Sequence, residues 1–167
     1  MAFITTNSTN IGEGLVVTTE VSIYYVDQNK IEHFTFPCLV DEEQLSVKQQ
    51  KNLNSSKQMN GTHDIFVNEF VRPVDAMVHV FAQLDPNSQI FTKGFEEKLF
   101  LEHFSGDKAY EVVDVTENNV PSYRKLEKYM WSKCCSYHFN KLETQQRFCS
   151  LFRLKLLLNF CAMAHHF

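Results

Sequence analysis

The spacing of apolar side chains predicts mostly strands in the first 117 residues of the chain. Residues 15–26 combine β-branched and aromatic side chains with a two-residue alternation, and residues 31–36 repeat this pattern after a turn at 27–30. Pro37 ends the second predicted strand. The same criterion predicts further strands, and the polar turns between them predict hairpins, at 64–71, 76–84, 89–93, 98–104 and 109–116.

Two of these segments have an alternative interpretation as short helices. Pro73 could open a helix over 74–84, and residues 95–104 could form another, although neither has a clean 3.6-residue period. Residues 41–63 are rich in amides, serine and lysine, so we expect a mobile loop there, with a short helix at 42–51 as the alternative. Residues 1–14 are polar, and we expect a frayed N-terminus.

The pattern becomes helical after the break at residues 118–122. Ser122 is suited to be an N-cap, and the segment behind it contains neither Gly nor Pro. Apolar side chains from Leu126 to Tyr137 recur at helical spacing, which predicts one long helix or two helices joined near residues 140–144. The alternation between Leu154 and Leu158 leaves a final strand as the competing interpretation.

These elements predict a single domain of the α+β class over residues 1–167. An antiparallel, β-rich N-terminal part built of hairpins (15–117) is followed by C-terminal helices (122–167). In the order of its elements the chain resembles small β-sandwich modules capped by a C-terminal helix, including pleckstrin-homology-like domains. That resemblance concerns fold alone and implies no function.

Composition excludes wholesale disorder and fibrous repeats, because 44% of the residues are hydrophobic and 22% are charged. The charge is distributed unevenly: residues 1–121 carry 8 basic and 18 acidic side chains, whereas residues 122–167 carry 8 basic and 2 acidic ones. This polarity favours an acidic partner such as nucleic acid or a membrane surface. The alternative is that the basic segment folds back onto the acidic part of its own chain or of a second subunit.

Targeting signals and cysteine usage indicate a cytoplasmic or nuclear location. The first residues lack a basic region followed by an apolar one, so no signal peptide is expected. The apolar stretch at 148–163 is short and interrupted by polar residues, which argues against a transmembrane segment. Five cysteines, four of them in the last 34 residues, are typical of reduced thiols and not of a disulfide framework.

No catalytic motif is found, and we predict that the chain is not an enzyme. With only five glycines it has neither a Walker loop nor a GxGxxG pattern, and GxSxG, HExxH and EF-hand patterns are absent from the sequence as well. A cysteine nucleophile activated by a histidine is the remaining enzymatic alternative.

Cysteine and histidine recur four residues apart near the C-terminus. On a helix, Cys134 with His138 and Cys161 with His165 would each present two ligands on one face, so zinc is considered as a cofactor. The alternative is that no cofactor is bound, that the thiols pack in the core and that the histidines belong to a frayed tail.

Basic and aromatic residues alternate in the segment after Ser122. Such a segment can neutralise phosphates and stack on bases, bind a membrane surface or an acidic groove, or cover the sheet as an amphipathic helix with its Trp in the core. The candidate nucleic-acid-binding residues are Arg124, Lys125, Lys128, Tyr129, Trp131, Lys133 and Lys141.

Apolar side chains crowd the last segment on nearly every side, which favours burial against a second subunit or inside the chain. Leu151, Leu154 and Leu158 are the candidate interface residues for a homodimer. The leading hypothesis is therefore a non-enzymatic protein-interaction module that self-associates or binds a protein partner, and nucleic-acid binding is the alternative.

Overall fold

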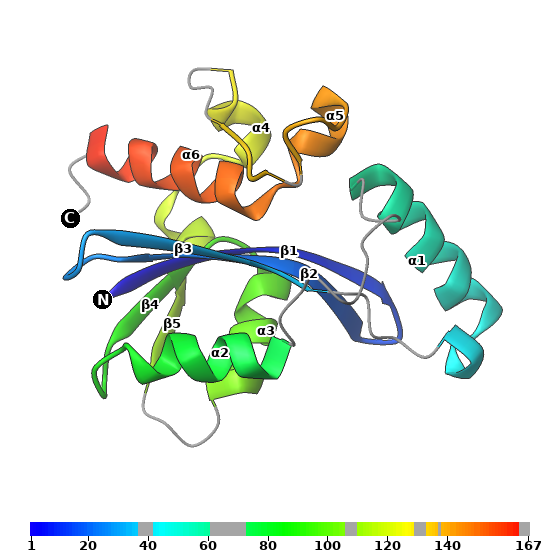
Figure 1. Ribbon diagram of the computed structural model, residues 1–167, viewed down its shortest axis with the longest axis horizontal. Helices are drawn as coiled ribbons and strands as arrows, with labels where there is room; N and C mark the ends of the chain where they lie inside the picture. The colour runs from blue at the N-terminus through cyan, green and yellow to red at the C-terminus, as the bar shows by residue number, and fades with distance from the viewer. Residues whose placement is uncertain (37–41, 61–72, 106–109, 129–132, 137, 164–167) are drawn as a thin grey trace.

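The computed structural model describes residues 1–36, 42–60, 73–105, 110–128, 133–136 and 138–163 (Figure 1). The strands are β1 Ala2–Gly12, β2 Leu15–Tyr25, β3 Lys30–Thr35, β4 Gln89–Thr92 and β5 Glu111–Asp114. The helices are α1 Val47–Asn60, α2 Pro73–Ala82, α3 Phe95–Ser105, α4 Tyr123–Leu126, α5 Glu143–Gln146 and α6 Ser150–Met163. None of the helices among these residues is long and apolar enough to cross a membrane.

A single five-stranded sheet with the order β3-β2-β1-β4-β5 forms the centre of the molecule. Strands β1, β2 and β3 are antiparallel neighbours, whereas β4 pairs parallel with β1, and β5 pairs parallel with β4. The predicted α+β content is therefore confirmed, but the expectation of a purely antiparallel, hairpin-built sheet is wrong. The single mixed sheet also differs from the two-sheet sandwich that the order of elements suggested.

The parallel pairs explain why two predicted strands are helices. A parallel neighbour is reached through a crossover connection, which is usually helical. α3 connects β4 to β5 in this way, and its residues include the segment 98–104. α2 covers most of 76–84, and Pro73 begins it, as the helical alternative anticipated. The strand predicted at 64–71 lies outside the described residues.

The frayed N-terminus predicted at residues 1–14 is instead the central strand β1. Its polar positions misled the prediction, because Thr5 and Thr6 are fully buried and hydrogen-bonded within the protein. The hydroxyl of Thr5 donates to the backbone oxygen of Ser150 over 2.7 Å, and this bond ties β1 to the start of α6.

Helix α1 occupies most of the segment 41–63, where a loop was predicted. It begins with a reciprocal cap: the backbone N–H of Ser46 donates to the Gln49 side chain, and the backbone N–H of Gln49 donates to the Ser46 hydroxyl. Leu53 is its buried anchor and packs against Ile11 and Val17. Side-chain hydrogen bonds from Gln49, Asn52 and Ser56 to the end of β1 add to this apolar contact and hold a helix whose composition is almost entirely polar.

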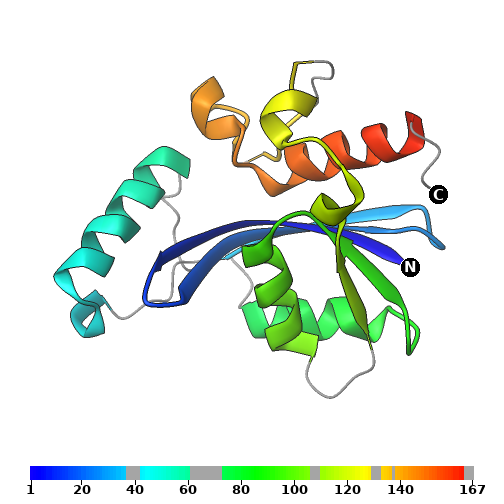
Figure 2. The same ribbon diagram turned by 180° about the vertical axis from the view of Figure 1, so that it is seen from behind.

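The sheet carries helices on both faces (Figures 1 and 2). α2 and α3 cover one face over a core that includes Ile4, Ile23 and Leu101. α6 covers the other face, where Leu154 and Leu157 pack on Phe3. The long C-terminal helix that was predicted is shorter than expected, because the described residues between α4 and α6 form turns and irregular chain apart from the single turn of α5.

Glu97 is a buried carboxylate in the first turn of α3. Burial raises the pKa of this side chain from 4.5 to about 7, against the opposing effect of the Arg153 guanidinium on α6. The folded state therefore takes up a proton that the unfolded chain does not hold between these two pH values. The stability that this proton contributes is complete below about pH 4.5 and is lost as the pH rises through 7.

We predict that Glu97→Gln is more stable than the unchanged protein at pH 8 and gains little at pH 5. The difference in unfolding free energy between variant and parent should grow by about 3 kcal/mol over this range, because the amide needs no proton. Urea unfolding at the two pH values measures it. Glu96→Gln, on the same turn but half-buried, is the control and should show no such pH dependence; equal behaviour of both variants would contradict the assignment.

Candidate metal centre

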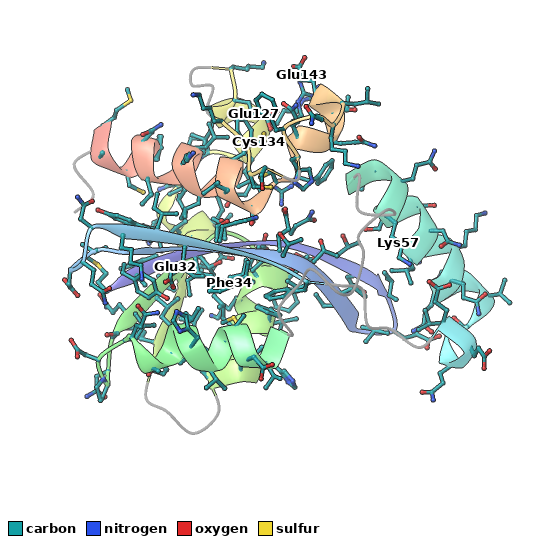
Figure 3. All side chains as sticks on the ribbon, viewed as in Figure 1. Glu32, Phe34, Lys57, Glu127, Cys134 and Glu143 are labelled. Carbon is teal, nitrogen blue, oxygen red and sulfur yellow. The ribbon has the colours of Figure 1, made fainter. Side chains whose placement is uncertain are left out.

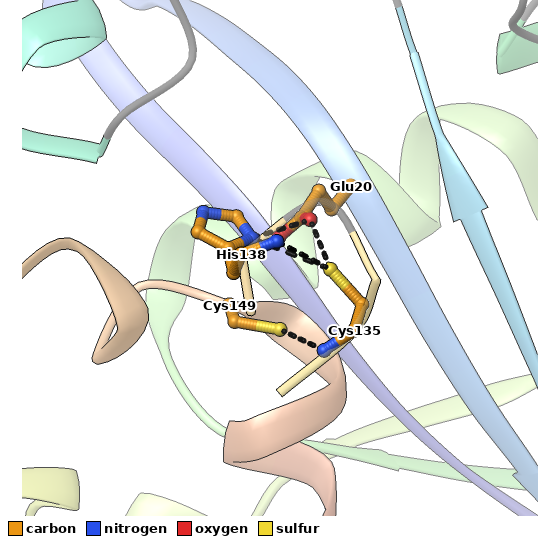
Figure 4. A group of neighbouring side chains, drawn as sticks. All are labelled: Glu20, Cys135, His138 and Cys149. Atoms are coloured by element: carbon orange, nitrogen blue, oxygen red, sulfur yellow. Dashed lines mark hydrogen bonds and ion pairs between the residues drawn. The ribbon is translucent and has the colours of Figure 1, made fainter. Parts of the chain in front are cut away.

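Four ligand-bearing side chains from distant parts of the sequence meet between the sheet and α6 (Figure 4). They are Glu20, Cys135, His138 and Cys149, and all four are buried. Their ligand atoms lie within 4.8 Å of one another. Within the described residues, these four are the histidine, cysteine and acidic side chains whose ligand atoms lie close enough together to hold a metal ion.

Strand β2 carries Glu20 on the same face as Ser22, directly after an irregularity in its pairing with β1. Asn7 pairs with Glu20 but Ser8 pairs with Thr18, so Thr19 is an extra residue on β2. Such a bulge changes the direction of neighbouring side chains. Val21 and Ile23 face the core beneath α2 and α3, whereas Glu20 faces α6.

A short turn supplies Cys135 and His138. The backbone N–H of Phe139 donates to the Cys135 oxygen over 3.0 Å, and the backbone N–H of His138 donates to the Cys135 sulfur over 3.4 Å. Cys149 lies directly before α6, and its carbonyl accepts the N–H of Arg153 in the first turn of that helix. The backbone N–H of Cys135 donates to the Cys149 sulfur over 3.3 Å, so the turn and the helix start are held together.

Two of the three distances match those between the ligands of a tetrahedral metal, and the third, between Glu20 and His138, is shorter. Glu20 Oε1 is 3.0 Å from His138 Nδ1 and 3.4 Å from Cys135 Sγ, and the latter two atoms are 3.4 Å apart. Zinc bonds of about 2.0–2.3 Å place tetrahedral ligands about 3.3–3.8 Å from one another. Two thiols, an imidazole and a carboxylate form a donor set that suits Zn²⁺.

The electrostatics of the group also favour a cation. Burial by itself lowers the pKa of His138, but hydrogen bonds with Cys149 and Glu20 outweigh it and raise the pKa to about 10. Hydrogen bonds from Cys134 and Cys135 lower the pKa of the Cys149 thiol. The hydrogen bond with Cys149, together with burial, raises that of Cys135. Protons thus provide the positive charge that balances the buried acids, and a metal ion would displace them.

A second layer of polar groups orients the carboxylate of Glu20. The backbone N–H of Ser150 donates to Oε2 over 3.0 Å, and Nε2 of His33 lies 3.7 Å from Oε1. Ser22 connects the two, because its hydroxyl is 2.7 Å from His33 Nδ1 and 2.8 Å from the Ser150 hydroxyl. Outer groups of this kind fix metal ligands in the orientation that binding requires.

The zinc ligands predicted from the sequence overlap with this group only at His138. Cys134 lies next to it and is half-buried, while Cys161 packs in a separate cluster with Phe3. His165 lies outside the described residues. The prediction assumed helical spacing, but the chain here forms an irregular turn, in which a cysteine and a histidine three residues apart can converge. Sequence reasoning missed Cys135, Cys149 and Glu20.

A signal for two of the missed ligands is present in the sequence. Cys135 and His138 are separated by two residues, and Cys149 follows after ten more, which is a spacing compatible with a zinc site. For Glu20 the sequence offers no signal, because it alternates within an ordinary strand pattern and lies more than a hundred residues away.

The other candidate residues are divided between surface and core. Arg124, Lys125, Lys128 and Lys133 are exposed and Lys141 is half-buried, whereas Tyr129 and Trp131 lie outside the described residues. Of the candidate interface residues, Leu154 is fully buried within the chain, and Leu151 and Leu158 are half-buried.

Comparison with known proteins gives no relative for this chain: neither a protein-family model nor a curated protein matches it.

We predict that the purified protein contains one Zn²⁺ per chain. Cys149→Ser and His138→Ala should each lose the metal and lower the unfolding free energy by more than about 3 kcal/mol, because the remaining buried charges are left uncompensated. Elemental analysis by mass spectrometry and urea unfolding measure the two effects. Cys161→Ser removes a buried thiol elsewhere on α6 and should keep the zinc. Loss of zinc from Cys161→Ser, or retention of zinc by Cys149→Ser, would contradict the site.

Proposed function

We propose that the chain is a non-enzymatic, zinc-stabilised domain that binds single-stranded nucleic acid in a groove beside the metal centre. The proposal rests above all on one feature, a groove of about 580 Å³ at the meeting point of α1, α4, α5 and α6. Three arginines and two aromatic rings line it: Arg124, Arg147, Arg153, Tyr123 and Phe148.

The arginines are arranged for contact with phosphate and bases. The Arg153 guanidinium lies 5.1 Å from the centres of both the Tyr123 and the Phe148 rings, so it is held between two aromatic faces. Arg124 is exposed on α4. Basic side chains that neutralise phosphates, together with rings on which bases stack, are the usual components of a groove for single strands.

Acidic side chains at the rim of the groove already pair with one of the arginines and would compete with phosphate groups for it. Arg147 contacts Glu127 over 3.1 Å and Glu143 over 3.5 Å. Figure 3 labels both acids, which lie on the same side of the molecule as α4 and α5. Phosphate groups would have to replace these exposed or partly exposed contacts, which are weak in water. We therefore expect moderate affinity with a steep salt dependence.

The proposal treats the metal as structural and not catalytic, because four protein donors would leave no ligand position open. Four protein donors complete a tetrahedral zinc shell, and all four donors are buried here. Catalytic zinc sites keep one position open for water or substrate. The metal centre then serves to fix the segment that carries the groove.

We predict that the protein binds labelled single-stranded oligonucleotides at low salt and releases them as salt increases. The triple variant Arg124→Glu/Lys125→Glu/Lys128→Glu should bind at least about tenfold more weakly, with a shallower salt dependence, because phosphate contacts are lost. Fluorescence anisotropy with RNA and DNA of mixed sequence measures both.

Lys98→Glu provides the matched control for this experiment. Lys98 lies on α3, on the opposite face of the sheet, and its reversal should leave binding unchanged. Zinc content and thermal unfolding confirm that the triple variant is folded. Absence of binding at low salt, or an equal loss in Lys98→Glu, would contradict the proposal.

A protein-interaction role is the second candidate, and exposed apolar side chains favour it. Phe139 is 68% exposed and Leu142 is 69% exposed, and Leu142 lines the groove together with Met59. Large apolar side chains that gather at one place are typical of contact surfaces. The α6 leucines no longer require a second subunit, because Leu154 and Leu157 are covered within the chain.

Self-association is tested separately by sedimentation equilibrium at micromolar concentration. A homodimer that dissociates in Met59→Ser/Leu142→Ser would support the second candidate and place its interface at the groove. A monomer of 19.5 kDa that binds oligonucleotides would leave nucleic-acid binding as the function of this surface.

A further inference from the structure

A third thiol lies beside the candidate metal centre without being one of its four donors. Cys134 is half-buried, whereas Cys149 is fully buried. The two thiols pack in the same small cluster, together with Leu126 and Phe152. The Cys134 sulfur also lies 3.8 Å from the backbone oxygen of Gln146 in α5. Figure 3 labels Cys134 near Glu127, on the same side of the sheet as α6.

We infer that Cys134 is an oxidation site that controls metal occupancy, by forming a disulfide with Cys149 when a hydroperoxide is present. The inference rests on the metal centre proposed above and adds its regulation. It is carried by the placement of a half-buried thiol against a buried donor sulfur.

The arrangement of the other thiols makes this the favoured pair. Cys135 Sγ is occupied on its inner side, at 3.4 Å from both Glu20 Oε1 and His138 Nδ1. Cys161 belongs to a different cluster, with Phe3 and Val115. Among the described cysteines, Cys134 is the one that is not fully buried, so a small oxidant reaches it first.

The chemistry balances with hydrogen peroxide as the oxidant. The Cys134 thiol gives up its proton as its sulfur attacks one peroxide oxygen; the O–O bond breaks, and the departing hydroxide takes up that proton and becomes water. The Cys149 thiolate then attacks the Cys134 sulfenic acid, the S–S bond forms, and the S–O bond breaks. The second hydroxide takes up a proton and leaves as water. Two thiols lose two electrons in total, and one peroxide is reduced to two waters.

The disulfide removes one of four donors from the centre. Cys149 can no longer offer a thiolate, and the three remaining donors hold zinc more weakly. The metal is then released as the aqueous ion. Reduction by a thiol reverses the oxidation and restores the donor set.

The experiment starts from the zinc-loaded, full-length protein. Its zinc content is measured first, then millimolar hydrogen peroxide is added and released zinc is followed with a chromogenic chelator. Peptide mapping by mass spectrometry identifies the disulfide. We expect loss of zinc together with a Cys134–Cys149 bond, and recovery of zinc binding after dithiothreitol and added Zn²⁺.

Cys134→Ser keeps all four donors and should lose the rapid release, while Cys161→Ser should release zinc like the parent. If Cys134→Ser does not fold, the mapped disulfide of the unchanged protein tests the same bond without a substitution. Equal release rates in parent and Cys134→Ser, or a disulfide that maps to Cys135 and Cys149, would overturn the inference. A protein without zinc before oxidation would instead overturn the metal centre itself.

Discussion

The structure depends on how the buried carboxylate of Glu20 is compensated. A charged group without solvent contact is strongly destabilising unless it is paired and hydrogen-bonded. One of its oxygens contacts Cys135 and His138, and the other accepts the backbone N–H of Ser150. Because these partners come from a separate turn and from the first residue of α6, one side chain of β2 fixes both segments on the sheet.

This constraint explains the irregular chain between α4 and α6. A continuous helix would place Cys149 about 21 Å beyond Cys135, because the two are 14 residues apart, and it could not bring the backbone N–H of Cys135 to the Cys149 sulfur. The chain instead turns at Cys135 and gains a small apolar core, in which Leu126, Phe152 and Leu156 pack around the thiols of Cys135 and Cys149. The loss of helical hydrogen bonds is thus offset by the contacts of Glu20 and by packing.

Local patterns determined how much of the fold could be predicted. Strands β2, β3 and β4 agree with the predicted segments within about one residue, because their alternation and turns are local properties. Strand β1 was missed because its inner positions are threonines, whose burial depends on partners such as Ser150, 145 residues away. The helices α2 and α3 were ambiguous for the same reason, since the parallel pairing that requires a crossover is not visible in a short apolar run.

The candidate metal centre shows the same limit more sharply. His138 was predicted, but under an assumption of helical spacing that joined it to Cys134 and left out Cys135, its neighbour in the turn. A carboxylate in the middle of a strand has no distinguishing sequence context, although alternation places it on the same face as Ser22. Contacts that span 115 or 130 residues, as Glu20 makes with Cys135 and Ser150, can be recognised only in three dimensions.

The position of Cys149 couples the metal centre to the groove. Cys149 precedes α6 directly, and its carbonyl accepts the N–H of Arg153, one helical turn further on. Phe148, on the other side of Cys149, carries the second ring against which the Arg153 guanidinium lies. Any change that releases the Cys149 sulfur therefore acts on the first turn of α6 and on the two groove residues that flank it. The candidate metal centre and the groove are held by the same few residues, so a shift of Cys149 is expected to change the shape of the groove as well.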